Sequence, residues 1–107
     1  MPQLESSKID LPAQHFAALK AILANQTPQA QVWVYGSRVT GQAHEGSDLD
    51  LVLRNKSDLK QDVMGLDSLI VALQESSLPV LVDVYQWASL PESFHQNIEA
   101  AYIEIQS

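Results

Sequence analysis

Residues 36–50 read Gly-Ser-Arg-Val-Thr-Gly-Gln-Ala-His-Glu-Gly-Ser-Asp-Leu-Asp. β-Branched and aromatic residues lead into this stretch and predict a strand over residues 31–35, and the alternating apolar pattern at its end predicts a second strand over residues 47–54. Between the strands we expect a short helical turn over residues 37–40 and a polar loop over residues 42–46. The stretch is therefore a glycine-rich connection between two strands.

Three of the four glycines of the chain, Gly36, Gly41 and Gly46, fall within this connection. Glycine permits tight turns and the close approach of backbone to a ligand. The turn at Gly36 and Ser37 can present backbone N–H groups to a phosphate. An ordinary strand–turn–strand connection would also account for the glycines, but it would leave the acidic residues that follow unexplained.

Two carboxylates, Asp48 and Asp50, stand two positions apart at the end of the connection, so they project from one face of the strand. A third strand, predicted over residues 80–86, holds Asp83 inside an otherwise apolar run. Solvated acids on an exposed sheet face are the ordinary explanation. Asp is nevertheless depleted in strands and seldom buried without a partner, and three such residues on two strands that look interior favour a shared site.

If the two acidic strands are neighbours, the three carboxylates can converge on one or two Mg²⁺ ions, because an all-oxygen site favours a hard cation over zinc. Two ions about 3.5–4 Å apart stabilise the entering and the leaving oxygen of an in-line displacement. Asp48 and Asp50 would then hold both ions and a triphosphate. Asp83 would hold the ion nearer the acceptor hydroxyl and take its proton. Ser37 and the adjoining backbone would bind the β- and γ-phosphates.

The rest of the chain predicts helices around these strands. A helix over about residues 10–25 takes Asp10 as its N-cap, and a second covers about residues 60–75. Ser89 resembles the cap of a last helix, whose apolar stripe extends to Ile105. The expected fold class is α/β (α+β), a small mixed β-sheet flanked by helices in the order α-β-(α)-β-α-β-α.

Length and composition limit the class of protein. A chain of 107 residues is expected to form one domain over residues 1–107, and its hydrophobic content of 46% argues against disorder. No apolar run approaches the length of a membrane span and no leader-like segment opens the chain, so we expect a soluble, cytoplasmic protein without a membrane partner. The absence of cysteine excludes disulfides, thiolate metal sites and a cysteine nucleophile.

The net charge is −7, from 13 acidic and 6 basic residues. This balance disfavours direct binding to nucleic acid, which depends on Lys and Arg along the phosphates. It does not exclude a nucleotide whose charge is offset by bound metal. An acidic face can also steer the encounter with a basic protein, although most of these acids are expected simply to keep the protein in solution.

The spaced set of glycine turn and acids resembles the pattern of the DNA polymerase β-type nucleotidyltransferase superfamily. The residues that carry the resemblance are Gly36, Ser37, Asp48, Asp50 and Asp83. An extended pattern is similar to that of the minimal nucleotidyltransferases (MNT), the antitoxin partners of HEPN ribonucleases. The further residues that match it are Arg38, Gly41, Ser47 and Leu51. The resemblance covers about residues 31–85, nearly all of a minimal family member.

The resemblance implies the nucleotidyltransferase fold and a Mg²⁺-dependent transfer of AMP from ATP to a hydroxyl, with two ions expected. In the MNT antitoxins this hydroxyl is a tyrosine of the cognate HEPN toxin, which adenylylation inactivates. The implied catalytic and metal-binding residues are Asp48, Asp50 and Asp83. The implied nucleotide-binding residues are Gly36, Ser37, Arg38 and Ser47. Because 107 residues leave no room for a separate acceptor domain, we expect a partner to complete the acceptor site.

Two rival functions stay open. A small-molecule nucleotidyltransferase of the antibiotic-modifying kind would need an acceptor domain for which this chain has no length. A catalytically silent antitoxin that neutralises its partner by binding alone would have no use for three carboxylates, which repel one another without a metal.

Other polar and aromatic residues have simpler explanations. Arg38 is expected either at a phosphate or in a surface or helix-capping position. His95 is expected to be a solvated residue of the last helix. Trp33, Tyr35 and Trp87 are expected to pack against the sheet rather than against a nucleotide base.

Overall fold

A computed structural model describes residues 9, 11–41 and 48–107. The elements are, in chain order, α1 (Ala13–Gln26), β1 (Ala30–Tyr35), α2 (Ser37–Thr40), β2 (Leu49–Asn55), α3 (Leu66–Glu75), β3 (Val82–Gln86), the 3-10 helix η2 (Trp87–Ser89), α4 (Glu92–Ala100) and β4 (Tyr102–Gln106). The helical turn expected after the glycine at position 36 is present as α2.

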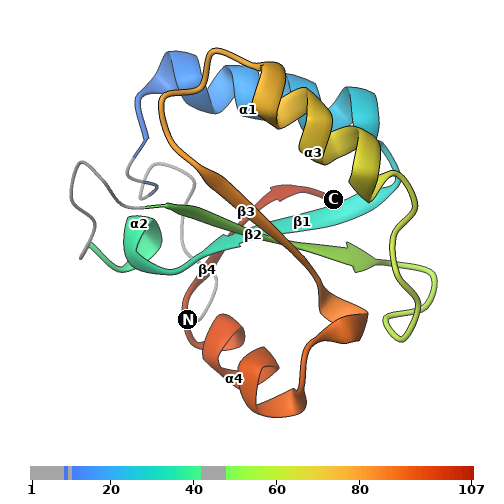
Figure 1. The fold of residues 1–107 in the computed structure, drawn as a ribbon. Helices are drawn as coiled ribbons and strands as arrows, with labels where there is room; N and C mark the ends of the chain where they lie inside the picture. The colour runs from blue at the N-terminus through green and yellow to red at the C-terminus, as the bar shows by residue number, and fades with distance from the viewer. Residues whose placement is uncertain (1–8, 10, 42–47) are drawn as a thin grey trace.

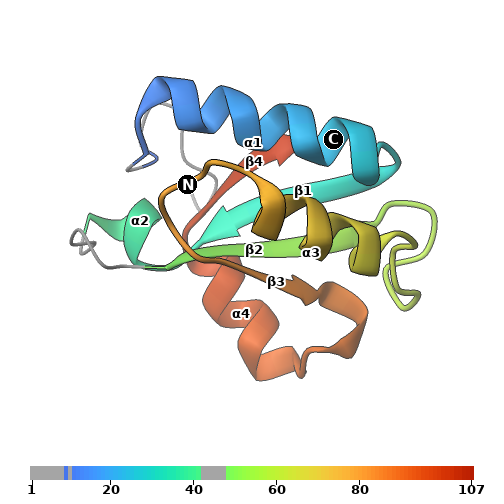
Figure 2. The ribbon, with the colours of Figure 1, turned by 45° about the horizontal axis from the view of Figure 1, so that its top comes forward.

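The strands form a mixed sheet in the order β3-β2-β1-β4. β1 is antiparallel to both β2 and β4, and β3 is parallel to β2. The parallel pair is connected through α3, as parallel strands require. α1 and α3 cover one face of the sheet and α4 lies on the other (Figure 1; Figure 2 shows the same layers turned). The prediction of a small mixed sheet flanked by helices is therefore confirmed, and the two acidic strands are neighbours.

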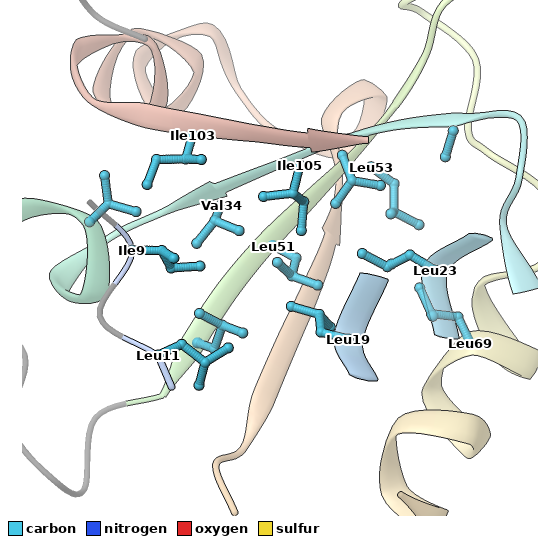
Figure 3. Close-up of a cluster of buried hydrophobic side chains, with 14 residues drawn as sticks. Ile9, Leu11, Leu19, Leu23, Val34, Leu51, Leu53, Leu69, Ile103 and Ile105 are labelled. Atoms are coloured by element: carbon cyan, nitrogen blue, oxygen red, sulfur yellow. The ribbon is translucent and has the colours of Figure 1, made fainter. Parts of the chain in front are cut away.

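The face toward α1 and α3 holds an aliphatic core. Every second residue of the strands points into it, because side chains alternate across a strand. Leucines from β2, α1 and α3 meet there with isoleucines from β4 (Figure 3). The side chains with no more than 1% exposure in this core are Leu19, Leu23, Ala30, Val32, Val34, Leu49, Leu51, Leu53, Leu69 and Ile103. Each fully buried large side chain stabilises the fold by roughly 1.5–3 kcal/mol.

The face toward α4 is aromatic. Trp33 stacks on Tyr102 with ring centroids 3.8 Å apart, and it meets Trp87 edge-on at 5.5 Å. Tyr35 is buried and packs edge-on against Phe94. The expectation that Trp33, Tyr35 and Trp87 pack against the sheet is confirmed.

His95 belongs to this aromatic layer. Its ring stacks on Trp87 at 3.7 Å, and its Nε2–H donates to the Trp87 carbonyl at 2.7 Å. The prediction of a solvated His95 is therefore wrong, because α4 turns this side chain toward the sheet and half-buries it.

The last helix is shorter than predicted, and a strand follows it. α4 ends at Ala100, and the next six residues are extended, with β4 paired antiparallel to β1. Ile103 and Ile105 point into the aliphatic core and Tyr102 lies on the opposite face. The helical interpretation failed because this segment alternates with a period of two, and a helical stripe leaves the completely buried Ile103 unaccounted for.

The helix starts also differ from the predictions. α1 begins at Ala13 with Pro12 as its N-cap, so the assignment of the cap to Asp10, which lies outside the described residues, is wrong. α3 begins at Leu66, after Gly65 adopts a left-handed conformation with φ 96°. Ser89 does not cap α4, since its hydroxyl donates instead to an Asp62 carboxylate oxygen at 3.2 Å.

The helices in the described part of the chain are all too short or too polar to cross a lipid bilayer.

Candidate active site

The carboxyl groups of the acidic motif lie at the β2–β3 junction, on the face toward α4. Asp50 and Asp83 are register partners in the parallel pair, and Asp48 directly precedes β2. Paired residues of neighbouring strands project to the same side of a sheet, so the two carboxyl groups stand side by side. The structure thus juxtaposes the three acids. One expectation is wrong: β3 is an edge strand and not an interior one, because sheet order depends on pairings distant in sequence.

Proximity and burial destabilise the charged forms of these acids. Burial raises the pKa of Asp50 above its ordinary value, and the charges of Asp83 and Asp48 raise it further. The pKa of Asp83 is raised by desolvation and by a side-chain hydrogen bond with Asp48, with a contribution from the Asp48 charge. Burial and the nearby charges therefore both disfavour the ionised forms of Asp50 and Asp83.

A divalent cation would relieve this repulsion. Over residues 9, 11–41 and 48–107, no three His, Cys, Asp or Glu side chains are already arranged around a metal position. Carboxylate oxygens are the ligands that Mg²⁺ prefers, and a cation between the acids would find ligands in Asp48, Asp50 and Asp83. The donor set fits Mg²⁺.

Gly36 lets the end of β1 pass directly against the Asp50 carboxyl group. Its backbone has φ 88° and ψ −159°, a combination that is essentially restricted to glycine. A Cβ at this position would lie 2.5 Å from Asp50 Oδ2, closer than atoms can approach. Ser37 follows as the first residue of α2, and the Gly36 carbonyl accepts hydrogen bonds from the N–H groups of Val39 and Thr40. The predicted phosphate-binding turn therefore adjoins the acidic cluster.

Two further residues, Arg38 and Ser47, were also predicted to bind the nucleotide. Arg38 is buried within α2, with 6% of its side chain exposed, so the expectation of a surface position is wrong. Ser47 lies outside the described residues, as do His44 and Glu45 in the same loop.

Two tyrosines beside the acids were missed as site residues at the level of sequence. Tyr85 is two positions after Asp83 and is 39% exposed; burial raises its pKa, and so do the charges of Asp83, Asp50 and Asp48. Tyr35 is the register partner of Asp50, and burial together with the Asp50 charge raises its pKa well above the ordinary value. The buried Tyr35 hydroxyl has no hydrogen-bond partner in the described part of the molecule. Asp83 and Tyr85 are two positions apart in the sequence, as Asp48 and Asp50 are, and this spacing could have indicated that Tyr85 lies beside the acids.

A sequence model of the family described as "Polymerase beta, Nucleotidyltransferase" matches residues 17–107. The chain belongs to this family. It is therefore an enzyme of the nucleotidyl-transferring class, and the superfamily resemblance carried by the glycine turn and the three acids is confirmed.

A curated relative and a solved structure agree with this membership. Over 100 residues the chain is 38% identical to a protein of Haemophilus influenzae named "Probable protein adenylyltransferase MntA", a match that covers 94% of this chain and 86% of the relative. This match confirms the resemblance to the minimal nucleotidyltransferases. A solved structure described as "Crystal structure of the toxin-antitoxin with AMP-PNP" superposes with a TM-score of 0.68 at 20% identity, covering 86% of this chain and 73% of that one. At this identity the second match shows the fold alone.

Proposed function

We propose that this nucleotidyltransferase moves AMP from Mg²⁺–ATP to a hydroxyl group of a partner protein, a tyrosine of a HEPN-type toxin, and thereby acts as an antitoxin. The observation that carries the proposal is the register of β2 with β3, which sets the Asp50 and Asp83 carboxyl groups side by side next to the glycine turn. The relative named as a protein adenylyltransferase supports a protein acceptor, and the neighbour crystallised as a toxin–antitoxin with AMP-PNP supports an adenine nucleotide and a toxin partner.

The transfer is an in-line displacement at the α-phosphorus of ATP. The acceptor oxygen forms a bond to that phosphorus, the bond from the α-phosphorus to the oxygen bridging the β-phosphate breaks, and pyrophosphate leaves. Magnesium, when bound, supplies charge neutralisation for the phosphates and the acids. Asp48 and Asp50 would hold the cation and, through it, orient the triphosphate. Asp83 receives the acceptor proton, and the exclusion of solvent that raises its pKa favours that role.

The glycine turn supplies the phosphate-binding part of the proposed site. Gly36 has no side chain to separate the β1 backbone from Asp50, so the phosphates can lie between the turn and the acids. Ser37 contributes its hydroxyl and N–H, and Ser47 and Arg38 complete the nucleotide contacts. The net charge of −7 disfavours direct binding to nucleic acid, and the absence of cysteine fits the cytoplasmic location that we propose for the enzyme.

The test is intact-mass measurement of a purified HEPN-type partner after incubation with the protein and Mg²⁺–ATP. We expect the wild type to add one or more AMP units to a tyrosine, and Asp48→Asn to add none, because it loses a cation ligand. Glu75→Gln is the matched control: it removes one exposed carboxylate from α3, which covers the opposite face of the sheet from the acidic cluster (Figure 1), and is expected to transfer at the wild-type rate.

Equal labelling by wild type and Asp48→Asn would contradict the catalytic assignment. Neutralisation of the toxin without ATP, together with calorimetry that shows no metal-dependent nucleotide binding, would instead establish the silent antitoxin that acts by occlusion.

A further inference from the structure

We propose that the acceptor protein docks an extended, tyrosine-bearing segment along the open edge of β3, over a surface formed by Leu81, Asp83 and Tyr85, here called the β3 edge. This inference rests on the proposed function, because it places the acceptor at the carboxyl group assigned to receive its proton. It adds the location of the partner and the conformation of the segment that the partner presents.

Among the described residues, β3 is paired on one side only. The sheet order ends at β3, whose register partners all lie in β2. The pairing already begins before the strand, since the Leu81 carbonyl accepts a hydrogen bond from the Leu49 N–H at 2.8 Å. The outward N–H and C=O groups of β3 are thus a template on which an extended segment of another protein can add as a further strand.

Exposed apolar side chains bracket the proposed proton acceptor. Leu81 is 74% exposed and Tyr85 is 39% exposed, and they stand two positions before and after Asp83. Because side chains alternate along a strand, these three side chains lie on one face. Along the strand, the Cα atoms of Leu81 and Tyr85 are each about 7 Å from that of Asp83. Exposed apolar surface beside an acidic site is the pattern of a protein-binding surface rather than of a solvated edge.

A groove of about 490 Å³ lies beside the same edge, on the face of the sheet toward α3. Aliphatic side chains from α3, from the segment before β3 and from β3 itself line it, namely Ile70, Leu73, Leu78, Val80, Val82 and Val84, and Leu81 and Asp83 also contribute to it. The acids face α4, so the groove lies on the opposite side of β3 from them. Because side chains alternate along a strand, the residues directly before and after the docked tyrosine would face this apolar groove.

These features select the chemistry of the occupant. Its backbone must be extended to pair with β3, and its tyrosine must stand over Asp83. Residues two positions from that tyrosine then face Leu81 and Tyr85, so at least one of them must be apolar. The net charge of −7 and the acids beside this edge favour a segment with Lys or Arg nearby, because electrostatic attraction would steer it toward them.

The first experiment measures the affinity of a purified HEPN-type partner for Leu81→Ser by calorimetry, and the KM and kcat of transfer to that partner. We expect the dissociation constant and KM to rise about tenfold, as for a central contact of an interface, while the affinity for Mg²⁺–ATP is unchanged. Met64→Ser is the control, because Met64 is 91% exposed but lies in the loop before α3.

Wild-type affinity and KM for Leu81→Ser would overturn the docking proposal. A wild type that binds the partner and transfers nothing would refute the proposed function while the affinity comparison still decides the docking surface.

The second experiment uses the absence of cysteine from the chain, which makes any introduced cysteine a unique labelling site. A photo-crosslinker attached through Leu81→Cys is expected to capture the partner on a peptide that contains the acceptor tyrosine. The same reagent on Met64→Cys is expected to capture none. Equal capture at both positions, or capture only from Met64→Cys, would place the partner elsewhere.

Discussion

The two faces of the sheet are made by the same four strands but from different kinds of residue. In β2, Leu49, Leu51 and Leu53 enter the aliphatic core under α1 and α3, whereas Asp50 and Arg54 face the opposite side. Because side chains alternate along a strand with a period of two, one strand can place core residues on one face of the sheet and functional residues on the other.

The face toward α4 is itself divided into a closed and an open half. At the end of β2, the Arg54 guanidinium lies 3.8 Å from the centre of the Trp33 ring and 4.5 Å from that of the Trp87 ring, and it donates to Gln31. Glu104 accepts hydrogen bonds from Gln31 and Trp33 at 2.8 and 3.1 Å. These polar side chains pair with one another, although the buried Arg54 Nε has no hydrogen-bond partner in the described part of the molecule. At the start of β2, by contrast, Asp50 and Asp83 lie close to other acids that raise their pKa values, and such an arrangement favours the binding of a cation.

Asp50→Asn is expected to have the largest effect on function and almost none on the fold. Loss of this carboxylate removes a cation ligand, so single-turnover transfer should fall by about 10³-fold, the equivalent of several kcal/mol of transition-state stabilisation. The melting temperature should stay level or rise, because the charge removed is one that its neighbours repel. A large fall in melting temperature would contradict the division between the two faces.

Leu51→Ala tests the adjacent residue on the other face. Leu51 is completely buried, and truncation leaves a cavity in the aliphatic core, so the free energy of unfolding should fall by about 2–5 kcal/mol. Urea denaturation measures this loss. The transfer rate per folded molecule should stay near that of the wild type at a temperature where both are folded. A variant that is fully stable but inactive would contradict the assignment.

Gly36→Ala is expected to lower both stability and transfer, because Gly36 lies against the Asp50 carboxyl group. The glycine-only backbone conformation costs another residue about 1–3 kcal/mol, and the new Cβ displaces the Asp50 carboxyl group. We expect a loss of stability smaller than that of Leu51→Ala, but with a loss of transfer that the folded fraction does not explain. Gly41→Ala is a useful control, since Gly41 also has a positive φ but a Cβ there meets no atom of the described residues within 4 Å. Equal activity losses in the two variants would show that backbone strain, and not the Asp50 position, is responsible.

Local patterns were sufficient for most of the fold and for the acidic cluster. The alternation around Asp48, Asp50 and Asp83 predicted the face that they share, and the apolar runs predicted β1, β2 and β3. β4 was missed because its five residues follow α4 without a turn signal, and only the free edge of β1 makes the strand the stable choice. The edge position of β3 and the burial of Arg38 were missed for a related reason: both depend on tertiary neighbours that no local pattern specifies.

The smallest expected effect is the pH dependence of stability that the acidic cluster produces. The folded-state pKa values of Asp50 and Asp83 are raised, so between an ordinary carboxyl pKa of about 4 and the raised values the folded protein binds more protons than the unfolded chain. Stability from this source is therefore present at low pH and is lost as the pH rises through the raised values. The stability of Asp50→Asn relative to wild type should accordingly increase from pH 4 to pH 7 in urea denaturation, a difference in which the acids outside the cluster cancel. Mg²⁺ at pH 7 should reduce the difference in stability between Asp50→Asn and wild type, because the cation binds the wild-type cluster in place of protons. A difference that is constant with pH, or that shrinks toward neutrality, would show that these acids do not repel one another in the folded protein.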